Sequence, residues 1–142
     1  MKQGDVYADS LAEFFEKFNI PANPDNPSDH DVMLARKLIL DEDIGEVEEV
    51  RDAFSNYLYI REAGSKAEQK EALAHLAKEL GDLIYVVFYA CHKLGIPMQV
   101  VFNRIHKSNL SKLDDNGKPI FDANGKVMKG PNYKKPDILS LF

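Results

Sequence analysis

The stretch that decides the fold is KAEQKEALAHLAKELGDLIYVVFYACHKL, residues 66–94. Apolar side chains recur in it every three or four residues, the spacing that places them on one side of an α-helix. This apolar stripe consists of Ala72, Leu76, Leu83, Val86, Val87, Ala90 and Leu94. Ser65 and Glu68 form a capping box at its start and Gly95 follows its end, so one helix is predicted over residues 66–94.

Residues 29–59 repeat the pattern, with a stripe of Val32, Ala35, Leu38, Ile39, Val50, Ala53 and Tyr57. A second long helix is therefore predicted, running to about Glu62 before Gly64. Two shorter helices are expected over Asp5 to Phe18 and from Pro97 to about Lys107. Together these segments predict an all-α bundle of four main helices.

The helical periodicity ends after Lys112. Asn116-Gly117 and Asn124-Gly125 are turn signals, and the second lies between two short apolar runs, so a small β-hairpin is predicted there. We expect residues 1–112 to form the helical bundle and residues 113–142 to form a non-helical tail of the same domain.

The composition narrows the choice of function. A chain of 142 residues fits one domain, and its net charge of −5 argues against a dedicated nucleic-acid surface. No apolar run approaches the roughly 18 residues that span a bilayer, so no membrane contact is expected. The single cysteine, Cys91, fits a reducing compartment, and a cytoplasmic protein is predicted.

Acidic residues interrupt both stripes, where packing favours aliphatic side chains. They are Glu42, Asp43, Glu46 and Glu49 in the first stretch and Glu79 and Asp82 in the second. Each buried carboxylate costs on the order of several kcal/mol if it is left without a partner. Several of them converging on one place need a cation, and a divalent metal with oxygen ligands is the simplest.

The spacing of these acids indicates which of them act together. Asp43-x-x-Glu46 and Glu79-x-x-Asp82 each place two carboxylates one helical turn apart, so that both can reach one ion. A competing pair, Glu46-x-x-Glu49, has the same spacing. Glu46 belongs to both alternatives.

Four stretches resemble a known family. They are LDEDIGEV (40–47), KELGDLIY (78–85), HKSNLSK (106–112) and the tail from Gly125-Lys126 to Pro136-Asp137. The first two resemble the double acidic signature of the all-α nucleotide pyrophosphohydrolases. That superfamily includes MazG-like, dimeric dUTPase-like and phosphoribosyl-ATP pyrophosphohydrolase-like proteins. The resemblance runs from about residue 30 to the end and favours the MazG-like and dUTPase-like branch.

The resemblance implies a magnesium-dependent enzyme, with manganese as a substitute, that cleaves a nucleoside triphosphate between its α and β phosphates. The products would be a monophosphate and pyrophosphate. The dUTPase-like features favour dUTP or dCTP in a house-cleaning role, and phosphoribosyl-ATP is the alternative substrate. A homodimer or a dimer of dimers is also implied.

The resemblance also assigns roles to residues. Asp43, Glu46, Glu79 and Asp82 would be metal ligands, although Asp43 stands where the family usually has glutamate. Glu42 and Glu46 would be catalytic, with Glu42 as a further ligand or as the base that activates water. The substrate would be bound by Lys107, Asn109, Lys112, Lys126, Lys129 and Tyr133, and the tail would close over it as a lid.

Two other functions compete with this interpretation. A four-helix di-iron protein usually needs Glu-x-x-His on two helices, whereas His75 follows Glu71 by four residues and His92 has no glutamate three before it. A non-catalytic helical module that binds nucleotides or a protein partner would place its acids on exposed faces. The position of the acids within the apolar stripes argues against that module, and magnesium-dependent pyrophosphate release from a panel of triphosphates would separate the three functions.

Overall fold

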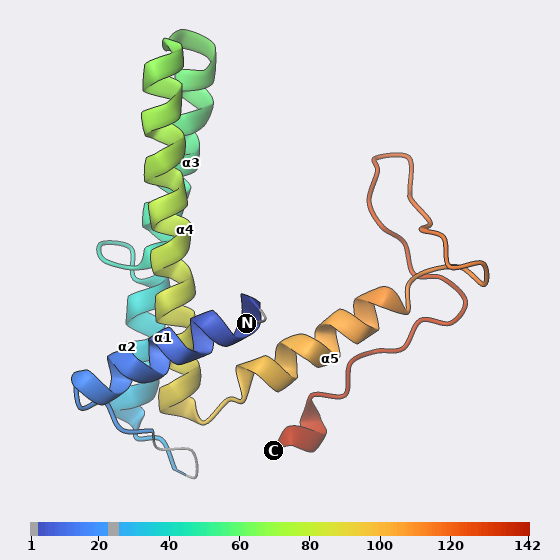
Figure 1. Cartoon of the computed structure of the whole chain (residues 1–142), viewed down its shortest axis with the longest axis horizontal. Helices are drawn as coiled ribbons and strands as arrows, with labels where there is room; N and C mark the ends of the chain where they lie inside the picture. Colours follow the sequence, from blue (N-terminus) through green and yellow to red (C-terminus); the bar gives the residue numbers. More distant parts are fainter. Residues whose placement is uncertain (1–2, 23–25) are drawn as a thin grey trace. The chain divides into compact units, whose positions relative to one another are not determined.

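The computed structural model describes residues 3–22 and 26–142, and its regular elements are helices (Figure 1). They are α1 (Gln3–Lys17), α2 (Asp29–Leu40), α3 (Glu46–Ala63), α4 (Lys66–Leu94), α5 (Met98–Leu110) and the short 3-10 helix η1 (Leu139–Leu141). The chain forms two compact units, Met1–Ile96 and Pro97–Phe142. The predicted all-α class is confirmed.

Helix α4 has the predicted bounds because both of its ends are capped as the sequence indicates. The Ser65 hydroxyl accepts a hydrogen bond from the Glu68 amide, and the Glu68 carboxylate accepts one from the Ser65 amide at 2.7 Å. Gly95 ends the helix in the left-handed region, at φ 66°, and its amide bonds to the carbonyl of Cys91. A left-handed residue after a helix favours glycine, which has no Cβ to clash.

The single helix predicted over residues 29–59 is wrong. Helix α2 ends at Leu40 and α3 begins at Glu46, so the described chain has five α-helices and not four. Asp41 stops the first helix, because its carboxylate accepts hydrogen bonds from the amides of Asp43 and Ile44 at 3.0 and 3.2 Å. The apolar residues before and after this turn follow the same helical spacing, so the apolar pattern alone did not reveal the break between the two helices.

Gly45 permits the close turn between α2 and α3. A Cβ at this position would lie 2.5 Å from the backbone nitrogen of Asp41 and 2.6 Å from its carbonyl oxygen. Any other residue would have to move the backbone. The turn therefore places Glu46 at the first position of α3.

In the first unit, α4 packs along both α2 and α3 (Figure 1). The buried apolar residues of this unit are Leu11, Phe15, Ala35, Ala53, Ala72, Leu76, Ala90 and Cys91. Helix α1 packs on α4 through Phe15, whose ring stacks on that of His92 with centroids 4.0 Å apart. A largely buried ion pair between Lys93 and Asp31, at 3.0 Å, joins α4 to α2. The packing of α3 along α4 brings Glu46, at the start of α3, close to Glu79 near the middle of α4.

The second unit consists of α5 and the tail. Asp114 and Asp122 each organise a turn by accepting two backbone hydrogen bonds, from Asn116 and Lys118 and from Asn124 and Lys126. The second turn leads to one antiparallel bridge between Phe121 and Val127. The predicted hairpin is thus present in its smallest form.

No single helix in the described residues is long and apolar enough to cross a membrane. Helices α4 and α5 meet that length and composition only when they are taken together.

Candidate active site

Three carboxylates meet where α3 begins beside α4. One oxygen from each of Glu46, Glu79 and Asp82 lies within 4.8 Å of the other two. Glu79 is 3% exposed, and the other two side chains are partly buried. The predicted convergence of acids from two helices is therefore present for these three residues.

The charges of this cluster act on one another. Burial, followed by the negative charges of Asp82 and Glu79, raises the pKa of Glu46 above its ordinary value of 4.5. The Lys78 ammonium lies 2.8 Å from an oxygen of Asp82 and 3.0 Å from an oxygen of Glu79. Hydrogen bonds to these two carboxylates raise the pKa of Lys78. The cluster thus holds excess negative charge that one lysine partly balances.

The donor atoms of the cluster suit a hard divalent cation. They are carboxylate oxygens, the ligands that Mg²⁺ and Mn²⁺ prefer, and the cluster contains no histidine or cysteine. It is the one group of at least three such ligand residues found among residues 3–22 and 26–142. The residues present therefore fit a divalent metal and do not form the histidine-containing site of a di-iron protein.

His75 lies beside the cluster without joining it. Its Nδ1 atom is 3.6 Å from an oxygen of Glu79, one helical turn further along α4, and its side chain is largely exposed. This distance exceeds that of an ordinary hydrogen bond, so His75 is a neighbour of Glu79 that solvent also reaches.

The remaining acids of the signature lie outside the cluster. Glu42 and Asp43 are exposed in the turn before α3, so Asp43 and Glu46 do not share a helix, contrary to the geometry that we predicted. Glu49 does lie one turn after Glu46 on α3, and its charge contributes to the raised pKa of Glu46. The ligand role of Asp43 and the catalytic role of Glu42 stay predictions.

The predicted substrate-binding residues all belong to the second unit. They are Lys107 and Asn109 on α5, Lys112 just after it, and Lys126, Lys129 and Tyr133 in the tail. The Lys129 ammonium lies 4.7 Å from the centre of the Tyr133 ring, a cation–π distance. The lysines at 107, 126 and 129 are exposed. Their roles in binding stay predictions.

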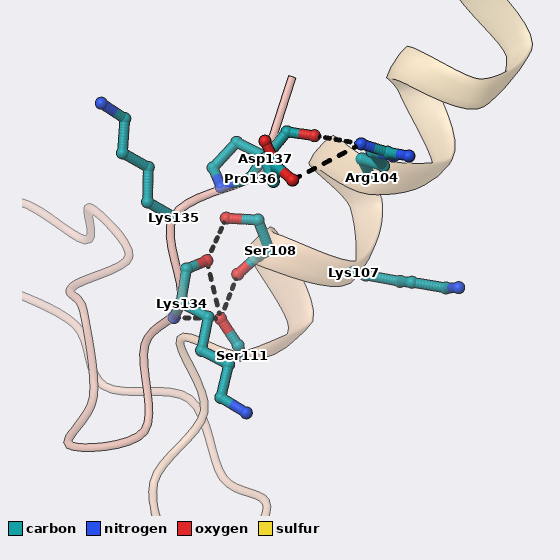
Figure 2. Close-up of a pocket in the computed structure, with 8 residues that line it drawn as sticks. All are labelled: Arg104, Lys107, Ser108, Ser111, Lys134, Lys135, Pro136 and Asp137. Atoms are coloured by element: carbon teal, nitrogen blue, oxygen red, sulfur yellow. Dashed lines mark hydrogen bonds and ion pairs between the residues drawn. The ribbon is translucent and has the colours of Figure 1, made fainter. Parts of the chain in front are cut away.

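A pocket of about 310 Å³ lies between α5 and the tail in this second unit (Figure 2). The Ser108 hydroxyl donates to the carbonyl of Lys134 at 2.7 Å, and the Ser111 hydroxyl accepts from the amide of Lys134 at 2.9 Å. Figure 2 shows the side chains of Lys107 and Lys135 extending away from these bonds. The pocket is therefore a seam that binds the tail to α5. Its two serines belong to the HKSNLSK stretch, in which the resemblance assigned roles only to Lys107, Asn109 and Lys112.

The site therefore consists of three converging carboxylates from two packed helices, one of them buried, whose oxygens suit a divalent cation. The sequence model of the phosphoribosyl-ATP pyrophosphohydrolase family matches residues 11–109, and the chain belongs to that family. The matched segment contains α2, α3 and α4 and all three clustered carboxylates. A comparison with curated proteins gives no match.

Membership of this family establishes the general activity. The family belongs to the all-α, MazG-like nucleotide pyrophosphohydrolases, so the expected superfamily is confirmed. The protein is an enzyme that hydrolyses phosphoric anhydride bonds, and it is not a non-catalytic module. A divalent metal is the usual cofactor of such enzymes.

Proposed function

We propose that the protein is a magnesium-dependent pyrophosphohydrolase that cleaves an NTP or dNTP between its α and β phosphates. The products are the nucleoside monophosphate and pyrophosphate. The observation that carries this proposal is the meeting of Glu46, Glu79 and Asp82 within 4.8 Å. A triphosphate is strongly negative, so an acidic site can receive it only together with cations.

Glu46, Glu79 and Asp82 would hold the metal, and Asp43 in the turn before α3 would supply a fourth ligand. Bound Mg²⁺ would neutralise phosphate oxygens and lower the pKa of a coordinated water. Glu42, close in sequence to these ligands and exposed, would accept the proton from the attacking water. The buried position of Glu79 keeps its side chain fixed while the substrate enters.

The phosphates and base would be bound by the second unit. Lys107, Lys126 and Lys129 are exposed cations that can neutralise phosphate charge. Asn109 and Lys112 would donate further hydrogen bonds, and Tyr133 offers a ring for stacking or contact with the base. This assignment rests on the resemblance of these residues to the family motif.

Two substrates deserve separate tests. The dUTPase-like features of the sequence favour a deoxypyrimidine triphosphate, dUTP or dCTP. The family match favours phosphoribosyl-ATP at least as strongly, because its description names that activity. Both substrates contain a triphosphate chain and would lose pyrophosphate by the same attack, so the carboxylate cluster serves either one.

The test is pyrophosphate release, with and without Mg²⁺, from dUTP, dCTP, the other canonical triphosphates and phosphoribosyl-ATP. We expect monophosphate and pyrophosphate in equal amounts, with no release in EDTA. Glu79→Gln should lower kcat/KM by about 100-fold or more, because the isosteric amide is a poor metal ligand. Release of orthophosphate and a diphosphate, or full activity of Glu79→Gln, would contradict the proposal.

A further inference from the structure

Lys78 contacts the carboxylate cluster but has no role in the proposed reaction. Its ammonium bridges two of the three clustered carboxylates, at 3.0 Å from Glu79 and 2.8 Å from Asp82. In the described part of the chain, the other basic group within ion-pair range of Glu79 is His75, at 3.6 Å. No ion pair joins Glu46 to a basic residue among the described pairs.

The contact between Lys78 and Glu79 matters because the Glu79 carboxylate is buried. The Glu79 side chain is only 4% exposed, so its charge needs a cation within the protein whenever no metal is bound. The Lys78 side chain is 63% exposed, and its ammonium reaches the cluster from the solvent side on a flexible stem. It can therefore return to water at little cost.

Lys78 contacts two of the carboxylates that a divalent ion would bind. The oxygen of Glu79 that accepts from Lys78 belongs to the carboxylate that a metal would bind, and so does the oxygen of Asp82. A divalent ion among these atoms would repel the nearby ammonium, because both are positively charged. Binding of the metal is therefore expected to displace the lysine.

We propose that Lys78 is the built-in counter-cation of the metal site, which neutralises Glu79 and Asp82 in the metal-free protein and sets metal affinity by competing for them. The inference rests on the proposed metal site and adds to it a residue that is not a ligand. Lys78 keeps the cluster folded before metal arrives, and it weakens metal binding by the strength of the contacts that must break.

The experiment is a titration of the metal-free, full-length protein with Mn²⁺, in which electron paramagnetic resonance measures the free ion. Lys78→Met removes the competing charge, and Lys78→Gln removes it while keeping a polar side chain. Lys70→Met is the matched control, because Lys70 lies on the same helix, is exposed and forms none of the described ion pairs. Glu79→Gln tests the site itself.

Both Lys78 variants should bind Mn²⁺ about fivefold to tenfold more tightly than the wild type, since two partly exposed ion pairs no longer oppose the metal. Lys70→Met should stay within about twofold of the wild type, as expected for a remote, screened charge. Without metal, Lys78→Met should melt at a lower temperature than Lys70→Met. Its gain in Tm on adding Mn²⁺ should be larger.

The outcomes separate the two proposals. If Lys78→Met and Lys78→Gln bind Mn²⁺ no more tightly than Lys70→Met while Glu79→Gln loses binding, the metal site stands and the competition is wrong. If Glu79→Gln binds Mn²⁺ as well as the wild type, the metal site itself is wrong. Should Lys78→Met fail to fold, the affinity of Lys78→Gln decides the question.

Discussion

Glu46 is the first residue of α3, where a helix dipole normally favours a negative charge and lowers a carboxyl pKa. Its pKa is nevertheless raised, because burial and the negative charges of Asp82 and Glu79 disfavour its ionised form. A residue held in an unfavourable charged state is a sign of function, since stability alone would favour a neutral side chain there. This conflict is what a bound divalent cation would relieve.

Glu46→Gln should therefore stabilise the metal-free protein at pH 7 while abolishing most of the activity. The pKa of Glu46 is higher in the folded protein than in the unfolded chain. Its ionisation therefore lowers the free energy of unfolding as the pH rises from the unfolded to the folded pKa. Below the ordinary value of 4.5, the wild-type group is protonated in both states and the advantage of the variant should vanish. Thermal melts in EDTA between pH 4 and pH 7 measure this difference. An unchanged or lower Tm at pH 7 would contradict the assigned burial and repulsion.

The two alternatives for the first acidic pair make opposite predictions. If Asp43 is a ligand, Asp43→Asn should lower kcat/KM by about 100-fold and Glu49→Gln by only a few-fold. If Glu49 completes the site, the order is reversed, and its position one turn after Glu46 on α3 gives that outcome a geometric basis. Steady-state kinetics of the two variants at saturating and limiting Mg²⁺ decide between them.

At the scale of the elements, local chemistry explains what the sequence could predict. The bounds of α4 were correct because Ser65, Glu68 and Gly95 supply explicit start and stop signals. The break between α2 and α3 was missed because the stripe continues in phase across it. The sequence signals for this break are Asp41, Gly45 and the acidic first turn of α3. The effect of Gly45 depends on a close backbone contact, which hydrophobic periodicity does not reveal. The position of Lys78 beside Glu79 and Asp82 was not predicted, because lysines next to acids are common on exposed helix faces.

Gly45→Ala should destabilise the protein by about 1–3 kcal/mol, because the new methyl group meets the backbone of Asp41 and the turn must open. It should also weaken Mn²⁺ binding, since Glu46 follows directly. Gly81→Ala is the matched control: its Cβ would have no neighbour within 4 Å, and alanine is the better helix former by about 1 kcal/mol. Urea unfolding compares the two variants. Equal stability would show that the turn tolerates a side chain.

The tail should respond to ligand in two different ways along its length. The amide of Lys134 is bonded to Ser111 at 2.9 Å, so it should be protected from hydrogen exchange even without substrate. Among residues 113–133, the amides without such a bond are predicted to gain protection when Mg²⁺ and a non-hydrolysable triphosphate are added together, as a lid would. Removal of residues after Lys112 should leave a metal-binding helical protein with a much lower kcat/KM. Exchange that ignores the ligand would make the tail a structural arm.

At the scale of the whole molecule, the long helices expose more apolar surface than an isolated chain would be expected to carry. The exposed residues on the first unit include Leu40, Ile44, Phe54, Leu58, Leu73, Leu80 and Ile84. Helix α4 has 29 residues, about 44 Å at 1.5 Å per residue. The shorter helix α1 packs on its C-terminal half, through Tyr85, Tyr89 and His92. The free apolar faces of α3 and α4 are therefore predicted to pack against a second copy of the chain.

Sedimentation at micromolar concentration should show a dimer or a dimer of dimers. Leu80→Glu should shift the protein to smaller species, because a charge would then have to be buried in the interface. Leu139→Glu is the control, since Leu139 is also an exposed leucine but lies in η1 near the end of the tail. Because Leu80 is next to Glu79, kinetics of Leu80→Glu would also show whether assembly supports the metal site. A stable wild-type monomer at these concentrations would contradict the predicted assembly, and the exposed leucines would then need another partner.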